Sequence, residues 1–179
     1  MRTVVKGTGF VVGEHLVKNS QFEKIMDTSD QWIKERSGIE QRYFVADGTS
    51  TSDLGTRACR IALEQAGLTP ADVDYVVFAT MTPDHFFPGS GSLLQSKLGL
   101  RNIPTLDIRQ QCTGFIYALQ VTDALLKARA AKTILLVGAE THSPFMPFAD
   151  WETLLGLADR EPTPEERAIH TAVRDRAVL

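Results

Sequence analysis

The stretch Ile108-Arg109-Gln110-Gln111-Cys112-Thr113-Gly114-Phe115-Ile116-Tyr117-Ala118-Leu119 decides the fold of this chain. It follows an apolar run over residues 103–108 that predicts a buried strand, and it continues into an apolar helix pattern that reaches Arg129. The helix is apolar on nearly all sides, which is typical of a helix in the interior of a fold. We therefore predict a sharp turn from strand to helix, with a cysteine at its apex.

Cys112 at this turn is a candidate nucleophile. A thiol at a helix N-terminus faces unpaired backbone N–H groups and the positive end of the helix dipole, and both favour the thiolate. The same N–H groups can stabilise an oxyanion. Gly114 is expected to let other backbone come close. The alternative is a small packed residue, because free cysteine is among the most buried residue types.

The surrounding segments predict an α/β fold. Two apolar runs of strand length, Tyr75–Thr80 and Thr133–Gly138, are typical of parallel strands covered on both faces. Helix patterns over residues 50–66 and 90–98 precede and follow the first of these runs. The alternation of strands and helices indicates parallel crossovers in a layered sheet.

The two ends of the chain predict smaller elements. Thr3–Val12 has the β-branched composition of a strand, and capping boxes beginning at Ser20 and Thr28 predict two short helices. Near the C-terminus we predict a short helix over residues 151–158 and another from Pro164. In the latter, the expected apolar face consists of Ile169, Ala172 and Val173. The last three residues have the pattern of the start of a strand.

Composition excludes several classes of function. The chain is 43% hydrophobic with a net charge of −3, and it has no stripe of basic residues that would indicate binding to nucleic acid. Its two cysteines suggest neither a disulfide framework nor a metal site, and we interpret Cys59 as a packing residue. No run approaches the roughly 18 apolar residues of a membrane span, and no signal peptide is visible. A cytoplasmic setting is expected, because it keeps a working thiol reduced.

Four motifs together give the chain a resemblance to a known family. In chain order they are Asp27-Thr28-Ser29-Asp30-Gln31-Trp32-Ile33 with Arg36-Ser37-Gly38-Ile39; Ala79-Thr80 with His85-Phe86-Phe87-Pro88; Asp107 with Cys112-Thr113-Gly114-Phe115-Ile116-Tyr117-Ala118-Leu119; and Val137-Gly138-Ala139-Glu140. The chain resembles the N-terminal half of a β-ketoacyl-acyl-carrier-protein synthase III, a thiolase-fold condensing enzyme. The resemblance implies an α/β fold that is one half of a layered αβαβα architecture. It covers about residues 3–139, and a helical insertion is expected over about residues 143–176.

The resemblance also implies roles for individual residues. Cys112 would hold the acyl group, Trp32 would stack on the adenine of coenzyme A, Thr28 would lie beside it and Arg36 near the mouth. Phe87 resembles an aromatic residue that closes the acyl pocket of the partner in a homodimer. The alternative for Thr28, Trp32 and Arg36 needs no ligand: they would form a helix cap and a half-buried aromatic contact. The alternative for Phe87 is a local anchor of its own loop. Thioesters of coenzyme A or acyl carrier protein are the implied substrates, with no permanently bound cofactor and no metal.

Two departures from the family pattern matter. The family's catalytic histidine and asparagine lie in a second half that this sequence lacks, so we expect a fragment, one half of a split protein or an interrupted sequence. The histidines present do not replace them: His15 and His170 are predicted at the surface, His85 belongs to the aromatic loop, and His142 is a weak candidate base. The insertion is the second departure, and the family arginine that contacts coenzyme A there has no clear counterpart.

Three functions therefore stay open on sequence. The first is decarboxylative Claisen condensation on a Cys112 acyl-enzyme, as a transferase of fatty acid biosynthesis and lipid metabolism. The second keeps the acyl-enzyme but transfers the acyl group to oxygen or nitrogen. The third is a non-catalytic half-domain that pairs with a catalytic chain.

Overall fold

The computed structural model describes residues 2–146, 148 and 150–176. They form two compact units. The first contains the residues up to Val11 together with Gly48–Thr141, and the second contains Val12–Asp47 together with the described residues from His142 onward. Within the part of the chain that is described, no helix is long and apolar enough to cross a membrane.

A parallel three-stranded sheet forms the centre of the first unit. Its order is β4-β3-β5, with β3 at Tyr75–Ala79, β4 at Thr105–Ile108 and β5 at Ile134–Gly138. Ala79 pairs with Ile108 on one side and with Gly138 on the other, so the three carboxyl ends are level. The predicted parallel crossovers are thus confirmed. Adjacent parallel strands bring the residues that follow them to one edge of the sheet.

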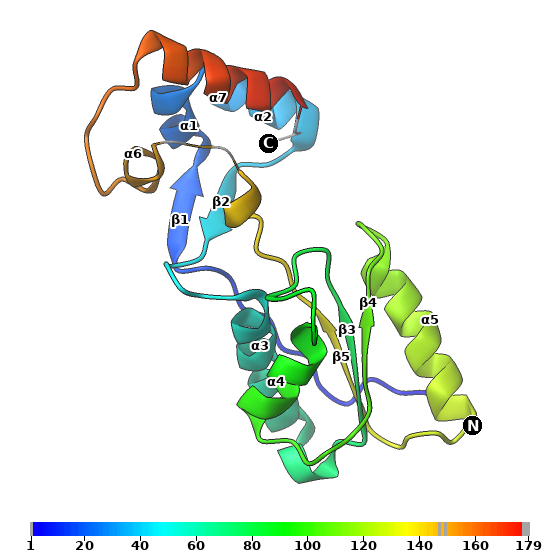
Figure 1. Ribbon diagram of the computed structural model, residues 1–179. Helices are drawn as coiled ribbons and strands as arrows, with labels where there is room; N and C mark the ends of the chain where they lie inside the picture. Colours follow the sequence, from blue (N-terminus) through cyan, green and yellow to red (C-terminus); the bar gives the residue numbers. More distant parts are fainter. Residues whose placement is uncertain (1, 147, 149, 177–179) are drawn as a thin grey trace. The chain divides into compact units, whose positions relative to one another are not determined.

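Helices cover both faces of this sheet. α3 (Thr51–Ala66) and α4 (Ser90–Leu98) lie on one face, and α5 (Gly114–Lys127) lies on the other (Figure 1). A short 3₁₀ helix, η1 (Pro70–Asp72), leads into β3. The larger core fills the α3/α4 side and includes Cys59, Leu63, Val73, Val76, Phe78, Leu94, Leu98, Ile103, Leu135 and Val137. On the α5 side the buried core is limited to Val77, Ala79 and Ala118.

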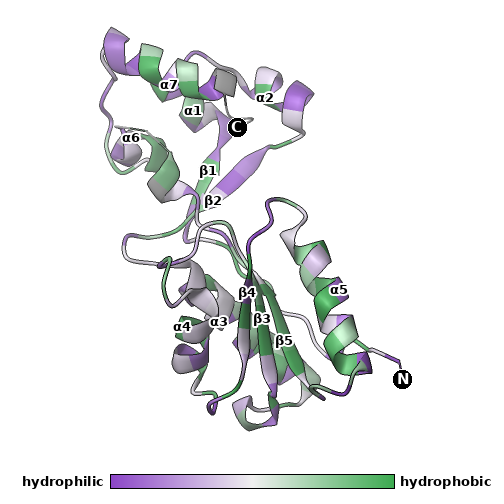
Figure 2. Ribbon diagram, turned by 45° about the vertical axis from the view of Figure 1, so that its right-hand side comes forward, coloured by the Kyte–Doolittle hydropathy of each residue, from purple (hydrophilic) through white to green (hydrophobic). Residues whose placement is uncertain are grey.

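α5 is only half covered. Its buried residues are Gly114, Ala118 and Thr122, all small. Its large apolar side chains are exposed, although much of the helix is coloured as hydrophobic (Figure 2). Their exposed fractions are 45% for Phe115, 64% for Ile116, 50% for Tyr117 and 41% for Leu119. The helix therefore has more apolar surface than the sheet can bury, because a sheet covers only one side of a helix.

The predicted strand over Thr3–Val12 is wrong, since no strand forms there among the described residues. Gly7 and Gly9 instead lie against the backbone of α3, where an added Cβ would be 2.3 and 1.9 Å from carbonyl oxygens. The backbone N–H of Thr8 donates to Oε1 of Gln65 at 2.6 Å. The glycines thus favour close contact with a helix over pairing with a sheet edge.

Cys59 is a packing residue, as predicted. It lies on the inner face of α3 with 4% of its surface exposed. Burial raises the pKa of its thiol to about 12. A thiol in this state is protonated at neutral pH and is a poor nucleophile.

The second unit joins two segments that are far apart in sequence. Strands β1 and β2 pair antiparallel, with His15 opposite Phe44. The core beneath them combines Phe22 and Ile25 from the early segment with Phe148 and Leu154 from the late one. The bounds of its elements are β1 His15–Lys18, α1 Asn19–Ile25, α2 Asp30–Ser37, β2 Gln41–Phe44, η2 Ser143–Phe145, α6 Trp151–Leu155 and α7 Pro164–Arg176.

The predicted apolar face of α7 is correct for Val173, which packs against the core of the second unit. It is wrong for Ile169, which is 52% exposed, and His170, which we predicted at the surface, is completely buried. The face that contacts α1 is polar: Arg167 donates to three backbone carbonyls near the end of α1, and Nδ1 of His170 lies 3.0 Å from the carbonyl oxygen of Ile25. The last carbonyls of a helix lack partners within it and attract cations, so polar side chains pack here in place of apolar ones. The strand predicted for the final three residues falls outside the described residues.

Candidate active site

Cys112 lies in the turn between β4 and α5, as the sequence predicted. β4 ends at Ile108, Thr113 is the N-cap residue and α5 begins at Gly114. The thiol is exposed. The alternative of a small buried cysteine is thereby excluded for the described chain.

The first turn of α5, which follows Cys112 directly in the chain, contains N–H groups without a backbone acceptor. The N–H of Gly114 is used by the carbonyl of Gln111 at 2.9 Å, and Tyr117 is the first residue to donate back to Thr113, at 3.1 Å. Within the described chain this leaves the N–H groups of Phe115 and Ile116 without a backbone acceptor. Donors of this kind at a helix start can stabilise negative charge.

The close approach expected at Gly114 does not occur. A Cβ added there would lie 3.7 Å from the Cβ of Ala79, which is an ordinary contact. At Gly138, by contrast, an added Cβ would come within 2.9 Å of the ring of Phe115. The glycine that makes room at this site is therefore the one that ends β5.

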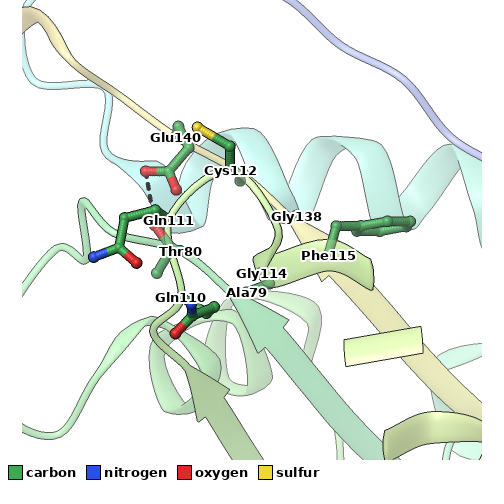
Figure 3. A pocket seen from close by; sticks show the side chains of 10 residues that line it. Ala79, Thr80, Gln110, Gln111, Cys112, Gly114, Phe115, Gly138 and Glu140 are labelled. Carbon is green, nitrogen blue, oxygen red and sulfur yellow. Dashed lines mark hydrogen bonds between the residues drawn. The ribbon is translucent and has the colours of Figure 1, made fainter. Parts of the chain in front are cut away.

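An open pocket of about 220 Å³ lies at the carboxyl edge of the sheet (Figure 3). It is smaller than the roughly 300 Å³ at the lower end of typical ligand pockets. Residues that follow all three strands contribute to its wall, and none of the described lining residues is a histidine. The lining consists of Ala79, Thr80, Gln110, Gln111, Cys112, Gly114, Phe115, Gly138, Ala139 and Glu140.

Glu140 and Thr80 were not predicted as site residues, although both belong to motifs in the sequence. Thr80 follows β3 and Glu140 comes two residues after the end of β5. The hydroxyl of Thr80 donates to Oε2 of Glu140 at 3.2 Å (Figure 3). The rule that side chains after neighbouring parallel strands meet at one edge could have identified both.

Asp107 on β4 supports the neighbouring loop and does not line the pocket. Its Oδ1 accepts from the N–H of Gly91 at 2.9 Å, at the start of α4. Added Cβ atoms at Gly89 and Gly91 would lie 2.2 and 2.4 Å from its carboxylate oxygens, so glycine is required at both. Burial raises the pKa of Asp107, and the backbone donors of α4 oppose that shift. The carboxylate thereby fixes the loop that carries Phe87.

Comparison with known proteins shows which proteins this chain is similar to. A family model described as 3-oxoacyl-[acyl-carrier-protein (ACP)] synthase III matches residues 106–159, which include the turn with Cys112. The β-ketoacyl-[acyl-carrier-protein] synthase III of Ruegeria pomeroyi is 42% identical over 179 residues, which are 94% of this chain and 55% of that protein. This chain is a homologue of β-ketoacyl-acyl-carrier-protein synthase III.

Two further synthase III proteins are similar to this chain over a comparable length. The Paracoccus denitrificans protein is 46% identical over 88% of this chain and 49% of its own length. The crystal structure of 3-oxoacyl-[acyl-carrier-protein] synthase III from Aquifex aeolicus superposes with a TM-score of 0.79 at 36% identity, over 86% of this chain and 50% of that one. The fold is thus one half of the α/β thiolase-like fold of these synthases, and the chain spans about half the length of the curated relatives that it matches.

The residues that the synthase III resemblance assigns to coenzyme A lie in the second unit. Ser29, not Thr28, caps α2, because its side chain accepts from the N–H of Trp32. Oγ1 of Thr28 is buried and has no hydrogen-bond partner within the described chain. Arg36 lies over the ring of Trp32, with Cζ 4.2 Å from the centroid, and Arg174 of α7 lies 4.8 Å from the same centroid. The sequence had not singled out Arg174, since nothing in its spacing links α7 to α2.

Phe87 projects from the loop before α4. It is 91% exposed, so it is not the local loop anchor that was the alternative to an interface residue. Its neighbour Phe86 is 77% exposed, and the guanidinium of Arg109 lies 4.8 Å from its ring centroid. Cys112 and Phe87 are thus carried by the first unit and the Trp32 group by the second. Within the described residues, no cluster of histidine, cysteine, aspartate and glutamate could hold a metal ion.

Proposed function

We propose that this chain is the nucleophile-bearing half of a condensing enzyme of the 3-oxoacyl-acyl-carrier-protein synthase III type. The observation that carries the proposal is the exposed Cys112 at the wall of the pocket, directly before the first turn of α5. A thioester carbonyl suits a soft sulfur nucleophile. The small pocket beside it suits a short acyl group.

In the first step the thiolate of Cys112 attacks the carbonyl carbon of an acyl thioester. The tetrahedral oxyanion is stabilised by the unpaired N–H groups of the first turn of α5. The bond from the carbonyl carbon to the donor sulfur then breaks. The donor sulfur leaves as a thiolate and takes up from water the equivalent of the proton that Cys112 released on ionising, and the acyl group stays on Cys112 as a new thioester.

In the second step a malonyl thioester loses carbon dioxide, and the resulting carbanion attacks the acyl carbon on Cys112. A carbon–carbon bond forms, the bond to the cysteine sulfur breaks and the Cys112 thiolate is regenerated. Stabilising that carbanion requires groups that the pocket does not contain. We assign this task to the histidine and asparagine of the second half, in the same or another chain.

The second unit would hold the donor as a coenzyme A or acyl-carrier-protein thioester. Trp32 offers an aromatic face, Arg36 a cation and Thr28 a hydroxyl that has no partner within the described chain. The guanidinium of Arg174 lies over the same ring, so an adenine that stacks there has to share the ring with it or displace it. We infer no permanently bound cofactor. A thiol nucleophile that consumes such thioesters favours the cytoplasm.

Two surfaces of the first unit support protein partners. The exposed apolar residues of α5 favour a second half packed against that helix, because such a patch is an aggregation liability when left in water. The exposed ring of Phe87 favours a homodimer in which it reaches the partner's acyl pocket.

Intact-mass spectrometry after incubation with a panel of acyl-coenzyme A thioesters tests the proposal. The expected result is one acyl adduct on the wild-type chain and none on Cys112→Ala. Absence of any adduct on the wild-type chain would instead support the non-catalytic half-domain. If the adduct forms but is released to an alcohol or amine rather than to a malonyl thioester, the function is acyl transfer to oxygen or nitrogen.

A further inference from the structure

Glu140 makes an unusually complete set of hydrogen bonds beside the pocket. Oε1 accepts from the backbone N–H of Met81 at 2.7 Å. Oε2 accepts from the backbone N–H of Thr82 at 3.0 Å, from the hydroxyl of Thr82 and from the hydroxyl of Thr80. All the donors belong to the turn after β3, so one side chain after β5 holds that whole turn.

The turn after β3 also makes hydrogen bonds within a buried cluster of threonines. The hydroxyl of Thr51, at the start of α3, donates to the backbone carbonyl of Thr82 and lies 2.7 Å from the hydroxyl of Thr141. The N–H of Thr141 donates to the hydroxyl of Thr82 at 2.9 Å. Thr51, Thr80, Thr82 and Thr141 are each at most 8% exposed. Only Glu140 carries a charge in this network, and only Glu140 and Thr80 also line the pocket.

This arrangement argues against a role for Glu140 as the base that deprotonates Cys112. An ionised carboxylate has about four acceptor sites. Oε2 accepts from three donors of the turn and Oε1 from one, so both carboxylate oxygens are engaged in holding the wall of the pocket. The carboxylate is instead placed to fix geometry.

We propose that Glu140 is a positioning residue of the Cys112 pocket. By fixing the Thr80–Thr82 turn it sets the wall against which the acyl group rests while its carbonyl faces the sulfur. The role rests on the proposed acylation of Cys112 and adds to it a residue that governs acyl placement. A small displacement of a reacting carbonyl can cost about 100-fold in rate.

Glu140→Gln tests the proposal, since the amide keeps the size of the side chain but replaces one acceptor oxygen with a donor. Two rates are measured on the full chain: acylation of Cys112 by an acyl-coenzyme A as a function of its concentration, and alkylation of Cys112 by iodoacetamide. The saturating acylation rate is expected to fall by about 10- to 100-fold. Alkylation, which needs no acyl placement, is expected to change by less than about twofold, because the thiol itself is untouched.

Asp74→Asn is the matched control. Asp74 precedes β3 and accepts from the N–H groups of Lys132 and Thr133 at 3.0 and 3.1 Å, so it joins β3 and β5 at the opposite end of the sheet. Its substitution is expected to leave both rates unchanged. If Glu140→Gln does not fold by circular dichroism, Thr82→Val takes its place. That variant removes one donor hydroxyl and is expected to lower acylation selectively but less.

The outcomes separate the two proposals. If the wild-type chain and Glu140→Gln are acylated at the same rate, the role of Glu140 is overturned and the proposed function stands. Equal losses of acylation and alkylation, or equal losses in Asp74→Asn, also overturn it, because they indicate a general structural effect. A wild-type chain that is not acylated at all defeats the proposed function and, with it, the role of Glu140.

Discussion

The sharpest prediction concerns the two cysteines, which the structure places in opposite environments. Cys112 is exposed in the turn before α5, whereas Cys59 is 4% exposed inside the α3 core. Burial raises the pKa of Cys59 from 9.0 to about 12. Each pKa unit changes the thiolate fraction tenfold at pH 8, so Cys59 has roughly a thousandfold less thiolate than an ordinary cysteine. Because the thiolate is the reactive form, its alkylation slows by about that factor even before steric protection is counted.

The assay is alkylation by iodoacetamide at pH 8, followed by intact mass and peptide mapping. The native wild-type chain is expected to take up one label quickly, on Cys112, and the second only after unfolding in guanidinium. Cys112→Ala should then remain unlabelled on the same timescale, while Cys59→Ala should label like the wild type. Comparable labelling rates for the two thiols in the native chain would refute the reasoning, since they would require Cys59 to be reachable and ionised.

Three further predictions follow from other parts of the structure. Arg167→Ala removes hydrogen bonds to three backbone carbonyls at the end of α1 and should lower the stability of the second unit by ~2–3 kcal/mol. Urea unfolding followed by tryptophan fluorescence reports this, because both tryptophans lie in that unit, and an unchanged midpoint would contradict it. Burial opposes ionisation of Asp53, but the ammonium of Lys97 at 2.6 Å and hydrogen bonds from Ser50 outweigh it and hold the pKa near 2. Since the unfolded carboxyl has the higher pKa, this stabilisation is complete above about pH 4 and lost as the pH falls towards 2; Asp53→Asn should flatten the acid limb of a thermal-unfolding profile, and an identical profile would argue against the pair. Ile116→Glu on the exposed side of α5 should reduce self-association in sedimentation experiments while leaving the circular dichroism spectrum unchanged, whereas a loss of secondary structure would mean that this side chain is buried.

The sequence by itself determined the central pattern of the first unit. Its apolar strands and the small residues at the start of α5 are local signals, and the strand-to-helix turn at Cys112 follows from where the two hydrophobic periods meet. The helix over Ser90–Leu98 was also predicted with its observed bounds, and Gly99 ends it in the left-handed conformation. Local chain geometry and hydrophobic period are properties of neighbouring residues, so they can be read without tertiary contacts.

Only the tertiary structure decided which surfaces these elements bury. Thr3–Val12 has a strand composition, yet its glycines lie against α3, and α7 packs on α1 through Arg167 and His170 while its apolar Ile169 faces outward. The four hydrogen bonds to Glu140 likewise depend on β3 and β5 being neighbours in the sheet. The physical reason is that backbone N–H and C=O groups find partners in segments that only the folded chain brings together. The hydrophobic period of a segment depends on its own residues, so it does not show which distant groups will be its partners.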